Sequence, residues 1–447
     1  MAKKKMTLEE KIEEAVVTDV PYEVPGNWIN VKLGAVAKWG SGGTPSRKHS
    51  EYYDGEIPWI KTGELNNGYI YDSEEKITHE AINKSSAKIF KKGSVLIAMY
   101  GATIGKVAIL GVDATTNQAC AAAECYEVVN NKFLFYYLLS QKENFIDLGK
   151  GGAQPNISQA IIKEYTIPLP TLKEQHRIVN RIENLFEKLD KAKELIEEAR
   201  DGFEKRKAAI LEKAFRGELT NDYRMKNNMA YNWSLNKLKN VAKITSGGTP
   251  SRKRPEYFEG EIPWIKTGEI IWSHIYDSEE HITQEAIDNS SAKLIPSGSV
   301  LVAMYGQGLT RGRAAILLGE ACTNQAVCAL IPTEKIRARY LYYYFMKNYW
   351  NFRQLAKGGN QENLSGKVIG EFEIEIPSVE EQKEIVRILD KFLEEESKID
   401  ELTQLEEQIE LIKKSILAKA FRGELGTNCE DEESALELLK EILSKDI

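Results

Sequence analysis

The sequence predicts an α/β (α+β) domain that occurs twice, with each copy followed by a long helix and the two helices paired as an antiparallel coiled coil. Three observations support this prediction. Long stretches recur at a nearly constant spacing, short strand-like runs alternate with Gly- and Pro-rich turns, and a heptad pattern follows each such region. Repeats at a fixed spacing decide an architecture, so we expect a pseudo-two-fold internal repeat.

The duplication is visible as identical words. The segment SGGTPSRK at 41–48 returns unchanged at 246–253. At this offset of 205, roughly 50 of the 75 residues in 27–101 are identical to their partners, and after an insertion near Gln307 the offset becomes 207. A match of this length has no plausible chance origin, so one whole unit is duplicated. The other recurring words are GEIPWIKTGE (55–64 and 260–269), YDSEE (71–75 and 276–280), TNQA (116–119 and 323–326) and KAFRGEL (213–219 and 419–425).

The first part of each unit has the pattern of a compact mixed domain. In the first copy, runs such as SVLIAM and KVAIL alternate with Gly- and Pro-rich turns, and FLFYYLLS is typical of an aromatic helix. Short apolar runs bounded by turn residues predict strands. We expect five parts: an N-terminal helical segment (1–26), a first α/β domain (27–170), a first long helix (171–220), a second α/β domain (221–377), and a second long helix with a C-terminal tail (378–447).

The second part of each unit is helical in pattern. Apolar residues at 4,3 spacing, with many flanking charges, predict a coiled coil. A helix from Glu174 to Phe215 would be about 63 Å long at 1.5 Å per residue. The first helix leads out of one domain to the other and the second leads back, so we expect an antiparallel pair with one domain at each end. The stripe residues are Ile178, Ile182, Leu185, Leu189, Ala192, Ile196, Ala199, Phe203 and Ile210 in the first helix, and Ile385, Leu389, Phe392, Ile399, Leu402, Ile409, Ile412 and Ile416 in the second.

Two amphipathic segments flank this arrangement. Apolar residues recur at helical spacing near the N-terminus, and again in the C-terminal tail. We expect these faces to meet and close the molecule, because each has an apolar side to bury. The residues are Leu8, Ile12 and Val16 at the N-terminus and Leu436, Leu439, Ile442 and Leu443 in the tail.

Composition narrows the class of protein. With 447 residues, of which 42% are hydrophobic and 28% charged, the sequence is typical of a soluble protein of two or three domains. No run of eighteen apolar residues occurs, and the N-terminus has no apolar secretory core, so we expect no membrane association and a cytoplasmic location. Five cysteines without a CxxC pair, and scattered histidines, predict free thiols and no metal site.

The net charge of −7 is unevenly distributed. Basic and acidic residues number 15 and 14 in 27–170, 17 and 15 in 232–377, and 10 and 20 from 378 to the end. The acidity therefore belongs to the second helix and the tail, and both α/β domains are neutral to faintly positive. Such a balance permits nucleic-acid binding through local patches.

Enzyme motifs are missing. GATIGKV at 101–107 has three residues between its glycines and Val107 after the lysine, whereas a P-loop needs four and a Ser or Thr. A Gly-rich hairpin is the better interpretation. No GxGxxG opens a helix, and no Asn-Pro-Pro-Tyr-like segment is present. We therefore expect no catalytic residues, no cofactor and no metal.

What the two copies share is polar, aromatic and cationic, and it lies in turns. Side chains of these types contact phosphates and base edges. We therefore predict a DNA-binding set of Ser46, Arg47, Lys48, Lys61, Thr62, Tyr100, Thr103, Lys106, Gln118 and Gln154 in the first copy and Ser251, Arg252, Lys253, Lys266, Thr267, Tyr305, Arg311, Arg313, Gln325 and Gln361 in the second.

Some shared residues favour a structural role. We expect the tryptophans of the two IPWI segments to lie in the core, and Asn117 and Asn324 to order turns rather than read bases. For Arg47 and Arg252 the sequence favours a solvated charge and a DNA contact equally. The glutamates Glu64 and Glu269 could accept from a cytosine amine, but a surface salt bridge is the stronger expectation.

Taken in order and twice over, SGGTPSRK, GEIPWIKTGEL, GSVLIAMYGATIGKVAIL, TTNQA, GGAQPNIS and PLPTLKEQHRIV closely resemble the specificity subunit of type I restriction-modification systems. The resemblance covers most of the chain, from about Asn27 to Leu425. It implies two target recognition domains that each read one half of a bipartite double-stranded DNA sequence. It also implies that the paired helices act as a spacer and dock two methyltransferase subunits, and that an ATP-driven restriction subunit joins them. Because the two domains here are unusually alike, we expect a nearly palindromic target.

Two rival functions remain at this stage. A methyltransferase or nuclease with degenerate motifs would need a cofactor-binding sheet, for which the duplicated map leaves no room. A coiled-coil scaffold with protein-binding ends explains the heptads equally well, and a DNA-binding test separates it from the specificity subunit.

Overall fold

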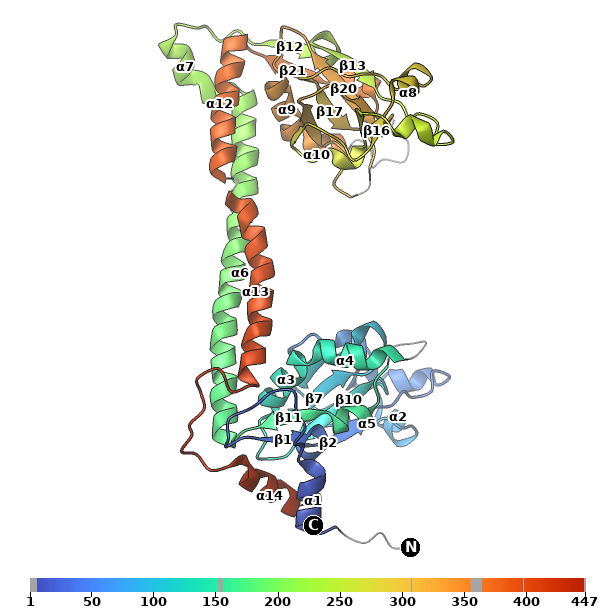
Figure 1. Cartoon of the computed structure of the whole chain (residues 1–447), viewed down its shortest axis with the longest axis vertical. Helices are drawn as coiled ribbons and strands as arrows, with labels where there is room; N and C mark the ends of the chain where they lie inside the picture. The colour runs from blue at the N-terminus through green and yellow to red at the C-terminus, as the bar shows by residue number, and fades with distance from the viewer. Residues whose placement is uncertain (1–5, 152–155, 307, 355–363, 397, 446–447) are drawn as a thin grey trace. The chain divides into compact units, whose positions relative to one another are not determined.

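The computed structural model describes residues 6–151, 156–306, 308–354, 364–396 and 398–445, excluding the side chains of 151 and 395–403. The chain divides into two compact units (Figure 1). Unit 1 consists of Met1–Leu195 together with Gln404–Ile447, and unit 2 of Ile196–Thr403. Each unit therefore contains one α/β domain and one part of the helical pair.

The α/β domain of unit 1 is built around a five-stranded sheet whose order is β2-β10-β7-β8-β4. A four-stranded sheet of order β5-β3-β9-β6 and the strand pair β1-β11 complete it. The strands are β1 (Ile29–Lys32), β2 (Ala37–Ser41), β3 (Ile57–Ile60), β4 (Tyr69–Ile70), β5 (Lys76–Ile77), β6 (Ile89–Phe90), β7 (Val95–Ala98), β8 (Val107–Leu110), β9 (Ala114–Thr116), β10 (Cys120–Cys125) and β11 (Thr166–Leu169). The helices are α2 (His79–Asn83), α3 (Asn131–Ser140), α4 (Lys142–Leu148) and α5 (Gln159–Glu164).

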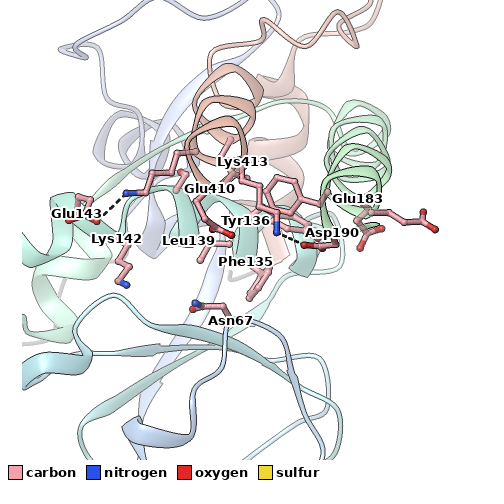
Figure 2. A pocket seen from close by; sticks show the side chains of 15 residues that line it. Asn67, Phe135, Tyr136, Leu139, Lys142, Glu143, Glu183, Asp190, Glu410 and Lys413 are labelled. Atoms are coloured by element: carbon pink, nitrogen blue, oxygen red, sulfur yellow. Dashed lines mark hydrogen bonds and ion pairs between the residues drawn. The ribbon is translucent and has the colours of Figure 1, made fainter. Parts of the chain in front are cut away.

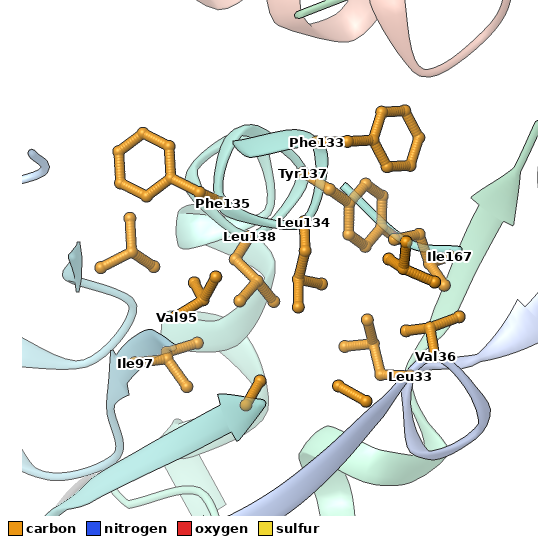
Figure 3. Close-up of a cluster of buried hydrophobic side chains, with 14 of the residues drawn as sticks. Leu33, Val36, Val95, Ile97, Phe133, Leu134, Phe135, Tyr137, Leu138 and Ile167 are labelled. Atoms are coloured by element: carbon orange, nitrogen blue, oxygen red, sulfur yellow. The ribbon is translucent and has the colours of Figure 1, made fainter. Parts of the chain in front are cut away.

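Strands β7 and β8 are buried on both faces, which explains why their sequences are continuously apolar rather than alternating. Val95 and Ile97 face a core that also holds Leu134 and Leu138 of α3, as Figure 3 shows. The alternate residues Leu96 and Ala98 belong to a second core on the other face. Both the predicted strands SVLIAM and KVAIL and the predicted aromatic helix are confirmed.

The domain of unit 2 repeats this plan. Its five-stranded sheet has the order β13-β20-β17-β18-β15, and the smaller sheet has the order β16-β14-β19. The strands are β12 (Ser234–Lys237), β13 (Ala242–Ser246), β14 (Ile262–Ile265), β15 (His274–Ile275), β16 (His281–Ile282), β17 (Val300–Ala303), β18 (Ala314–Leu317), β19 (Cys322–Thr323), β20 (Val327–Pro332) and β21 (Glu373–Ile376). The helices are α8 (Gln284–Asp288), α9 (Ala338–Lys347), α10 (Tyr349–Gln354) and α11 (Gly366–Glu371).

The long helix α6 (Leu172–Phe215) ends where the heptad pattern predicts. In unit 1 it pairs with α13 (Lys398–Ala420), where Lys413 Nζ lies 2.5 Å from Asp190 and Lys193 Nζ lies 3.9 Å from Glu410. The partner number falls as the α6 number rises, so this pairing is antiparallel.

In unit 2 the later part of α6 pairs with α12 (Val379–Glu396). The rings of Phe203 and Phe392 stack with centroids 6.4 Å apart, and Thr220, just beyond α6, bonds Glu381 near the start of α12. This pairing is also antiparallel, so the predicted antiparallel coil is confirmed within each unit.

Parts of the expected apolar stripe differ from the structure. Ile412 is 45% exposed and Ala199 is also exposed, so neither lies in the seam. Near Ile412 the inward position is taken by Lys413, whose ammonium lies 5.4 Å from the ring centre of Phe186. A lysine stem can cover apolar surface while its charge remains near water. The side chains of Ile399 and Leu402 lie outside the described residues.

The two terminal segments meet in unit 1, as expected. Helix α1 (Leu8–Ala15) and helix α14 (Ala435–Lys445) both contribute to the main core, through Ala15 and through Leu439 and Ile442. The Lys11 ammonium donates to the carbonyl oxygen of Leu443 at 3.3 Å. The described part of the chain contains no helix with both the length and the apolarity needed to cross a membrane.

The cysteines are free. Cys120, Cys322 and Cys328 are buried, Cys125 is half-buried and Cys429 is exposed. Burial raises the pKa of the Cys120 thiol to about 12, which makes it a poor nucleophile. The expectation of free thiols is confirmed.

Candidate nucleic-acid interface

Backbone hydrogen bonds bring the predicted DNA-binding turns of unit 1 to one edge of the domain. The turn after β9 links them, because Asn117 N donates to the carbonyl of Ile60 at 3.0 Å and Met99 N donates to that of Ala119 at 2.9 Å. Ile60 precedes Lys61, and Met99 precedes Tyr100. Gln118, Lys61 and Tyr100 therefore start from neighbouring strand ends.

The same bonds recur in unit 2. Asn324 N donates to the carbonyl of Ile265 at 3.0 Å, and Met304 N donates to that of Ala326 at 2.9 Å. Asn117 and Asn324 use their side-chain oxygens to accept from Ala119 N at 3.2 Å and Ala326 N at 3.1 Å, respectively. Their predicted turn-ordering role is confirmed.

The loop SGGTPSRK is held by close backbone packing. A Cβ atom at Gly42 would lie 2.1 Å from the carbonyl oxygen of Thr116, and at Gly247 it would lie 2.0 Å from that of Thr323. Only glycine fits such an approach. The indole of Trp59 donates to the Gly43 carbonyl at 2.9 Å, so the tryptophan also anchors this loop.

Both IPWI tryptophans lie in the core, as expected. Trp59 is 3% exposed and Trp264 is 2% exposed. Trp264 makes the equivalent indole bond to the Gly248 carbonyl at 2.9 Å. The repeated words SGGTP and IPWI thus form one structural element in each unit.

Arg47 takes part in an ion-paired cluster on this loop. Its guanidinium contacts both carboxylate oxygens of Glu75, at 2.5 and 3.1 Å, and lies 4.0 Å from the ring centre of Tyr53. Lys61 also reaches Glu75 at 3.1 Å and Glu74 at 3.0 Å. The hydrogen bond from Arg47 lowers the pKa of Glu75 below its usual range.

Unit 2 reproduces the cluster. Arg252 lies 2.7 Å from Glu280 and 4.1 Å from the ring centre of Phe258, and Lys266 lies 3.0 Å from Glu280 and 3.2 Å from Glu279. Burial raises the pKa of Glu280, but hydrogen bonds from Lys266 and Arg252 outweigh it, so the net shift is downward. Arg47 and Arg252 are therefore neither purely solvated nor free for DNA.

The neighbouring residues are more accessible. Ser46, Lys48, Ser251 and Lys253 are all exposed. Within the described residues, the ammonium groups of Lys48 and Lys253 have no ion-pair partner. Thr62 and Thr267 begin short 3-10 helices and are half-buried.

The Gly-rich segment between β7 and β8 is a hairpin, as interpreted from sequence. Gly101 and Gly105 have φ values of 65° and 76°, which favour glycine. Tyr100 at its start is 44% exposed, and Thr103 bonds the Tyr100 carbonyl at 2.8 Å. Lys106 at its end is half-buried.

The corresponding hairpin of unit 2 carries Tyr305, Arg311 and Arg313. Tyr305 is 40% exposed. Arg311 and Arg313 are half-buried, and within the described residues their Nε atoms are buried without a hydrogen-bond partner. Both arginines thus have their inner guanidinium edges turned into the protein.

Gln118 and Gln325 are exposed and hydrogen-bonded to the repeated SGGTPSRK loop. Each side-chain oxygen accepts from a threonine hydroxyl of that loop, Thr44 in unit 1 and Thr249 in unit 2. Gln154 and Gln361 lie outside the described residues.

The two glutamates of the KTGE turns have structural partners. Glu64 lies 3.9 Å from Lys61, but its side chain is only 14% exposed, so this is a loose, largely buried pair and not the expected surface salt bridge. Glu269 instead accepts from Lys266 N at 2.8 Å and from Ser278 Oγ at 3.2 Å, so the expectation of a salt bridge is wrong for this copy as well. Its carboxylate caps the turn because it satisfies a backbone donor there.

Thr44, Tyr53 and Glu75 also belong to this edge, although the sequence did not predict them as part of the DNA-binding set. The recurrence of YDSEE in both copies marks Glu75 as part of the repeat. Its role could not be predicted from this recurrence, because it depends on the contact with Arg47, which is 28 positions away in the sequence. No group of three or more His, Cys, Asp or Glu side chains able to hold a metal ion occurs in the parts of the chain that the structure describes.

Comparisons with known proteins agree with this geometry. The family model for the type I restriction modification DNA specificity domain matches residues 25–200 and again 231–411. The two matches coincide with the two copies of the repeat.

Curated relatives and solved structures extend the likeness. The MjaVIII specificity subunit of Methanocaldococcus jannaschii is 25% identical over 90% of this chain and 94% of its own length. The MjaIX specificity subunit of that organism is 28% identical over 66% of this chain and 70% of its own length.

Among solved structures, one chain from work on complex assembly and conformational transition of the type I R-M system has a TM-score of 0.71 at 21% identity, covering 91% of this chain and 100% of its own. The HsdS subunit of Thermoanaerobacter tengcongensis has a TM-score of 0.56 at 20% identity, covering 92% of this chain and 100% of its own. These two structures support the fold.

Proposed function

This chain belongs to the type I restriction modification DNA specificity family, and from that premise we propose that it reads a bipartite double-stranded DNA target for partner enzymes. Each α/β domain reads one half of the target, and the helices serve as spacer and docking platform. The partners are two methyltransferase subunits and a restriction subunit. The chain itself contributes recognition and no catalysis.

The observation that supports this proposal best is the repeated edge. In both units the same backbone bonds gather a loop cation, a tyrosine and a glutamine at neighbouring strand ends. Exposed Lys48 and Lys253 supply positive charge for phosphates, and exposed Tyr100 and Tyr305 supply faces and hydroxyls for base contact. We assign DNA contact to this edge, with Arg47 and Arg252 contributing after exchange of their carboxylate partners for phosphate.

We propose a division of labour along the chain that follows the repeat. Residues 27–170 and 221–377 form the target recognition domains. Residues 171–220 and 378–447 form the spacer helices with the C-terminal tail, and 1–26 is an N-terminal helical segment.

The two half-sites should be nearly identical and inverted, because the domains share so much of their sequence. The copies differ most in 65–69 against 270–274 and in 102–104 against 307–311. If these loops touch bases, the half-sites differ at one or two positions.

Mapping of methylated adenines tests the proposal. The chain is combined with its methyltransferase subunits, and the modified sites are located by single-molecule sequencing. We expect two inverted, similar half-sites at fixed separation. The chain alone, with labelled S-adenosylmethionine and the same DNA, should stay at background. Absence of sequence-specific DNA binding would favour a protein-binding scaffold instead.

A further inference from the structure

A cavity of about 910 Å³ lies inside unit 1, and none of the residues predicted to bind DNA lines it. Helices α3 and α4 form one wall and α6 and α13 the other, as Figure 2 shows. Phe135, Tyr136 and Phe186 give it aromatic walls, and Asn67 closes one side from the loop before β4. Tyr136 and Phe186 meet edge to face at 5.9 Å.

The second copy places its own indole at this position. Trp272 is the counterpart of Asn67, and both residues have left-handed backbones, with φ of 60° and 58°. The Trp272 ring packs edge-on against Tyr342 at 5.8 Å and against Tyr349 at 5.5 Å. These tyrosines correspond to Phe135 and Lys142 of unit 1 in the repeat.

The backbone of this loop is thus matched in the two units, and the side chain differs. A left-handed conformation is costly for tryptophan, and in unit 2 the Tyr342 hydroxyl bonds the Trp272 carbonyl at 2.8 Å. In unit 1 the Asn67 side chain accepts from Val107 N at 3.3 Å. Asparagine tolerates this backbone better than other non-glycine residues, so unit 1 keeps the loop shape without filling the aromatic site.

The charge around the cavity is acidic. Its lining contains five acidic side chains and three lysines, a balance of −2. Four of the five acids have a lysine partner, at 2.5 Å (Lys413–Asp190), 2.7 Å (Lys132–Glu183), 3.7 Å (Lys414–Glu143) and 3.9 Å (Lys193–Glu410). Glu187 is the lining acid that has no ion-pair partner among the described residues. A basic residue beside an entering side chain can therefore pair with Glu187.

We propose that the unit 1 cavity is a docking site for a partner protein that inserts a tryptophan side chain flanked by basic residues. Trp272 shows that an indole is accommodated at this place in the fold. An aromatic anchor in a pocket with a polar, charged rim is the usual composition of a protein-binding hot spot. None of the residues predicted to bind DNA lines the cavity, but Asn67 belongs to the loop 65–69 that could touch bases, so peptide binding is measured without DNA.

The test uses the full chain and an acetylated, amidated Lys-Trp-Arg peptide that carries 5-fluorotryptophan, observed by ¹⁹F NMR. We expect binding to the wild-type chain. The variant Asn67→Trp with Lys142→Tyr copies the unit 2 arrangement into unit 1 and should weaken binding at least tenfold. The reciprocal variant, Trp272→Asn with Tyr349→Lys, should add a second site.

Three controls sharpen the result. A Lys-Ala-Arg peptide carrying fluorine on its acetyl cap should not bind, and a Glu-Trp-Glu peptide should bind less tightly than Lys-Trp-Arg. Glu187→Lys, which changes the rim without filling the cavity, should also weaken binding. The proposal is overturned if Lys-Trp-Arg does not bind, or if Asn67→Trp with Lys142→Tyr and Glu187→Lys both leave its affinity unchanged. Binding of free indole without binding of the peptide would overturn it in favour of a small aromatic ligand.

Discussion

Each unit buries one glutamate of a coil helix, and the two units compensate its charge with side chains from different parts of the chain. Each coil helix carries a buried glutamate near its start, Glu174 with 1% exposed in unit 1 and Glu381 with 2% exposed in unit 2. The glutamine that follows each is also buried and bonds the same way, Gln175 to the Pro170 carbonyl at 3.1 Å and Gln382 to that of Pro377 at 3.1 Å. A buried carboxylate needs compensating partners.

In unit 2 the partners come from the segment that follows α6. The hydroxyl of Thr220 bonds Glu381 at 2.6 Å, and Arg224 of α7 (Asn221–Lys226) forms an ion pair with the same oxygen. The indole of Trp233 donates to the other oxygen at 3.1 Å. The Arg224 side chain is only 9% exposed, so this pair is shielded from water.

In unit 1 the hydroxyl partner comes from the C-terminal tail, and the cation comes from α6 itself. The hydroxyl of Thr427 bonds Glu174 at 2.6 Å, and Arg177 donates to Glu174 at 2.8 Å. Arg177 also forms a two-pronged pair with Glu432 at 2.8 and 2.9 Å. The segment RGELTN (216–221) of unit 2 corresponds to RGELGTN (422–428) here, so the threonine is part of the duplication and the outer pair is not.

The comparison teaches that duplication copied the buried glutamate with its threonine, while the cation was supplied separately. In unit 2 the partners of the buried Glu381 all lie within the continuous segment Ile196–Thr403 that forms this unit. Unit 1 is closed by residues about 250 positions away, which makes the C-terminal tail a structural part of it.

Removal of the tail should produce the largest difference in stability between the two units. Ending the chain at Leu425 deletes Thr427, Glu432 and the buried Leu439 and Ile442 of α14. Two buried aliphatic side chains alone contribute about 3–6 kcal/mol. We expect hydrogen exchange measured by mass spectrometry to rise in the α/β domain of unit 1 and to stay unchanged in that of unit 2. Equal change in both domains would contradict the assignment of the tail to unit 1.

Matched arginine substitutions should show the next largest difference. Arg224→Met leaves Glu381 buried without its cation, and such losses cost about 3–5 kcal/mol. Arg177→Met should cost less, about 1–2 kcal/mol, because Arg177 is 37% exposed and water can replace part of it. Urea unfolding, monitored by hydrogen exchange in each unit, checks both values. A larger loss for Arg177→Met would mean that the tail pair is the more strongly shielded one.

The Arg177–Glu432 pair of unit 1 should respond to acid. Hydrogen bonds from Arg177 hold the pKa of Glu432 at about 2, below the usual 4.5. A carboxylate with a lowered pKa stabilises the fold above its unfolded pKa, and that contribution disappears as the pH falls from about 4.5 to 2. Glu432→Gln should therefore destabilise unit 1 at pH 6 and have a smaller effect at pH 3. Thermal unfolding at both pH values measures it, and an effect independent of pH would show that the charge of Glu432 is not what matters.

The sequence predicted the parts of the molecule whose signal is periodic or repeated. Heptads predicted α6 and its antiparallel partners, and identical words predicted two domains with one topology. It did not predict that Glu75 pairs with Arg47, that Thr44 bonds Gln118, or that Thr427 bonds Glu174. Those contacts join residues from 28 to 253 positions apart. Their geometry depends on how the chain closes in space, which neither heptad spacing nor residue type records.

The smallest expected effect concerns the two exposed loop lysines. Lys48 and Lys253 occupy equivalent positions, and neither has an ion-pair partner in the described residues, in contrast to Arg47 and Arg252. If each contacts one phosphate, Lys48→Ala and Lys253→Ala should each weaken DNA binding and reduce the salt slope by about one unit. Because the domains are near copies, the two losses should be equal.

Fluorescence anisotropy with a labelled duplex at several salt concentrations measures these losses. Lys84→Ala serves as the control, because Lys84 directly follows α2 and its ammonium is paired with Glu80 at 2.7 Å. Arg47→Ala should change the slope by less than Lys48→Ala, since binding a phosphate there requires Glu75 to release the arginine first. An unchanged slope in both lysine variants would remove these loops from the DNA-binding surface. Unequal slopes would show that two domains of like sequence meet the two halves of the target differently.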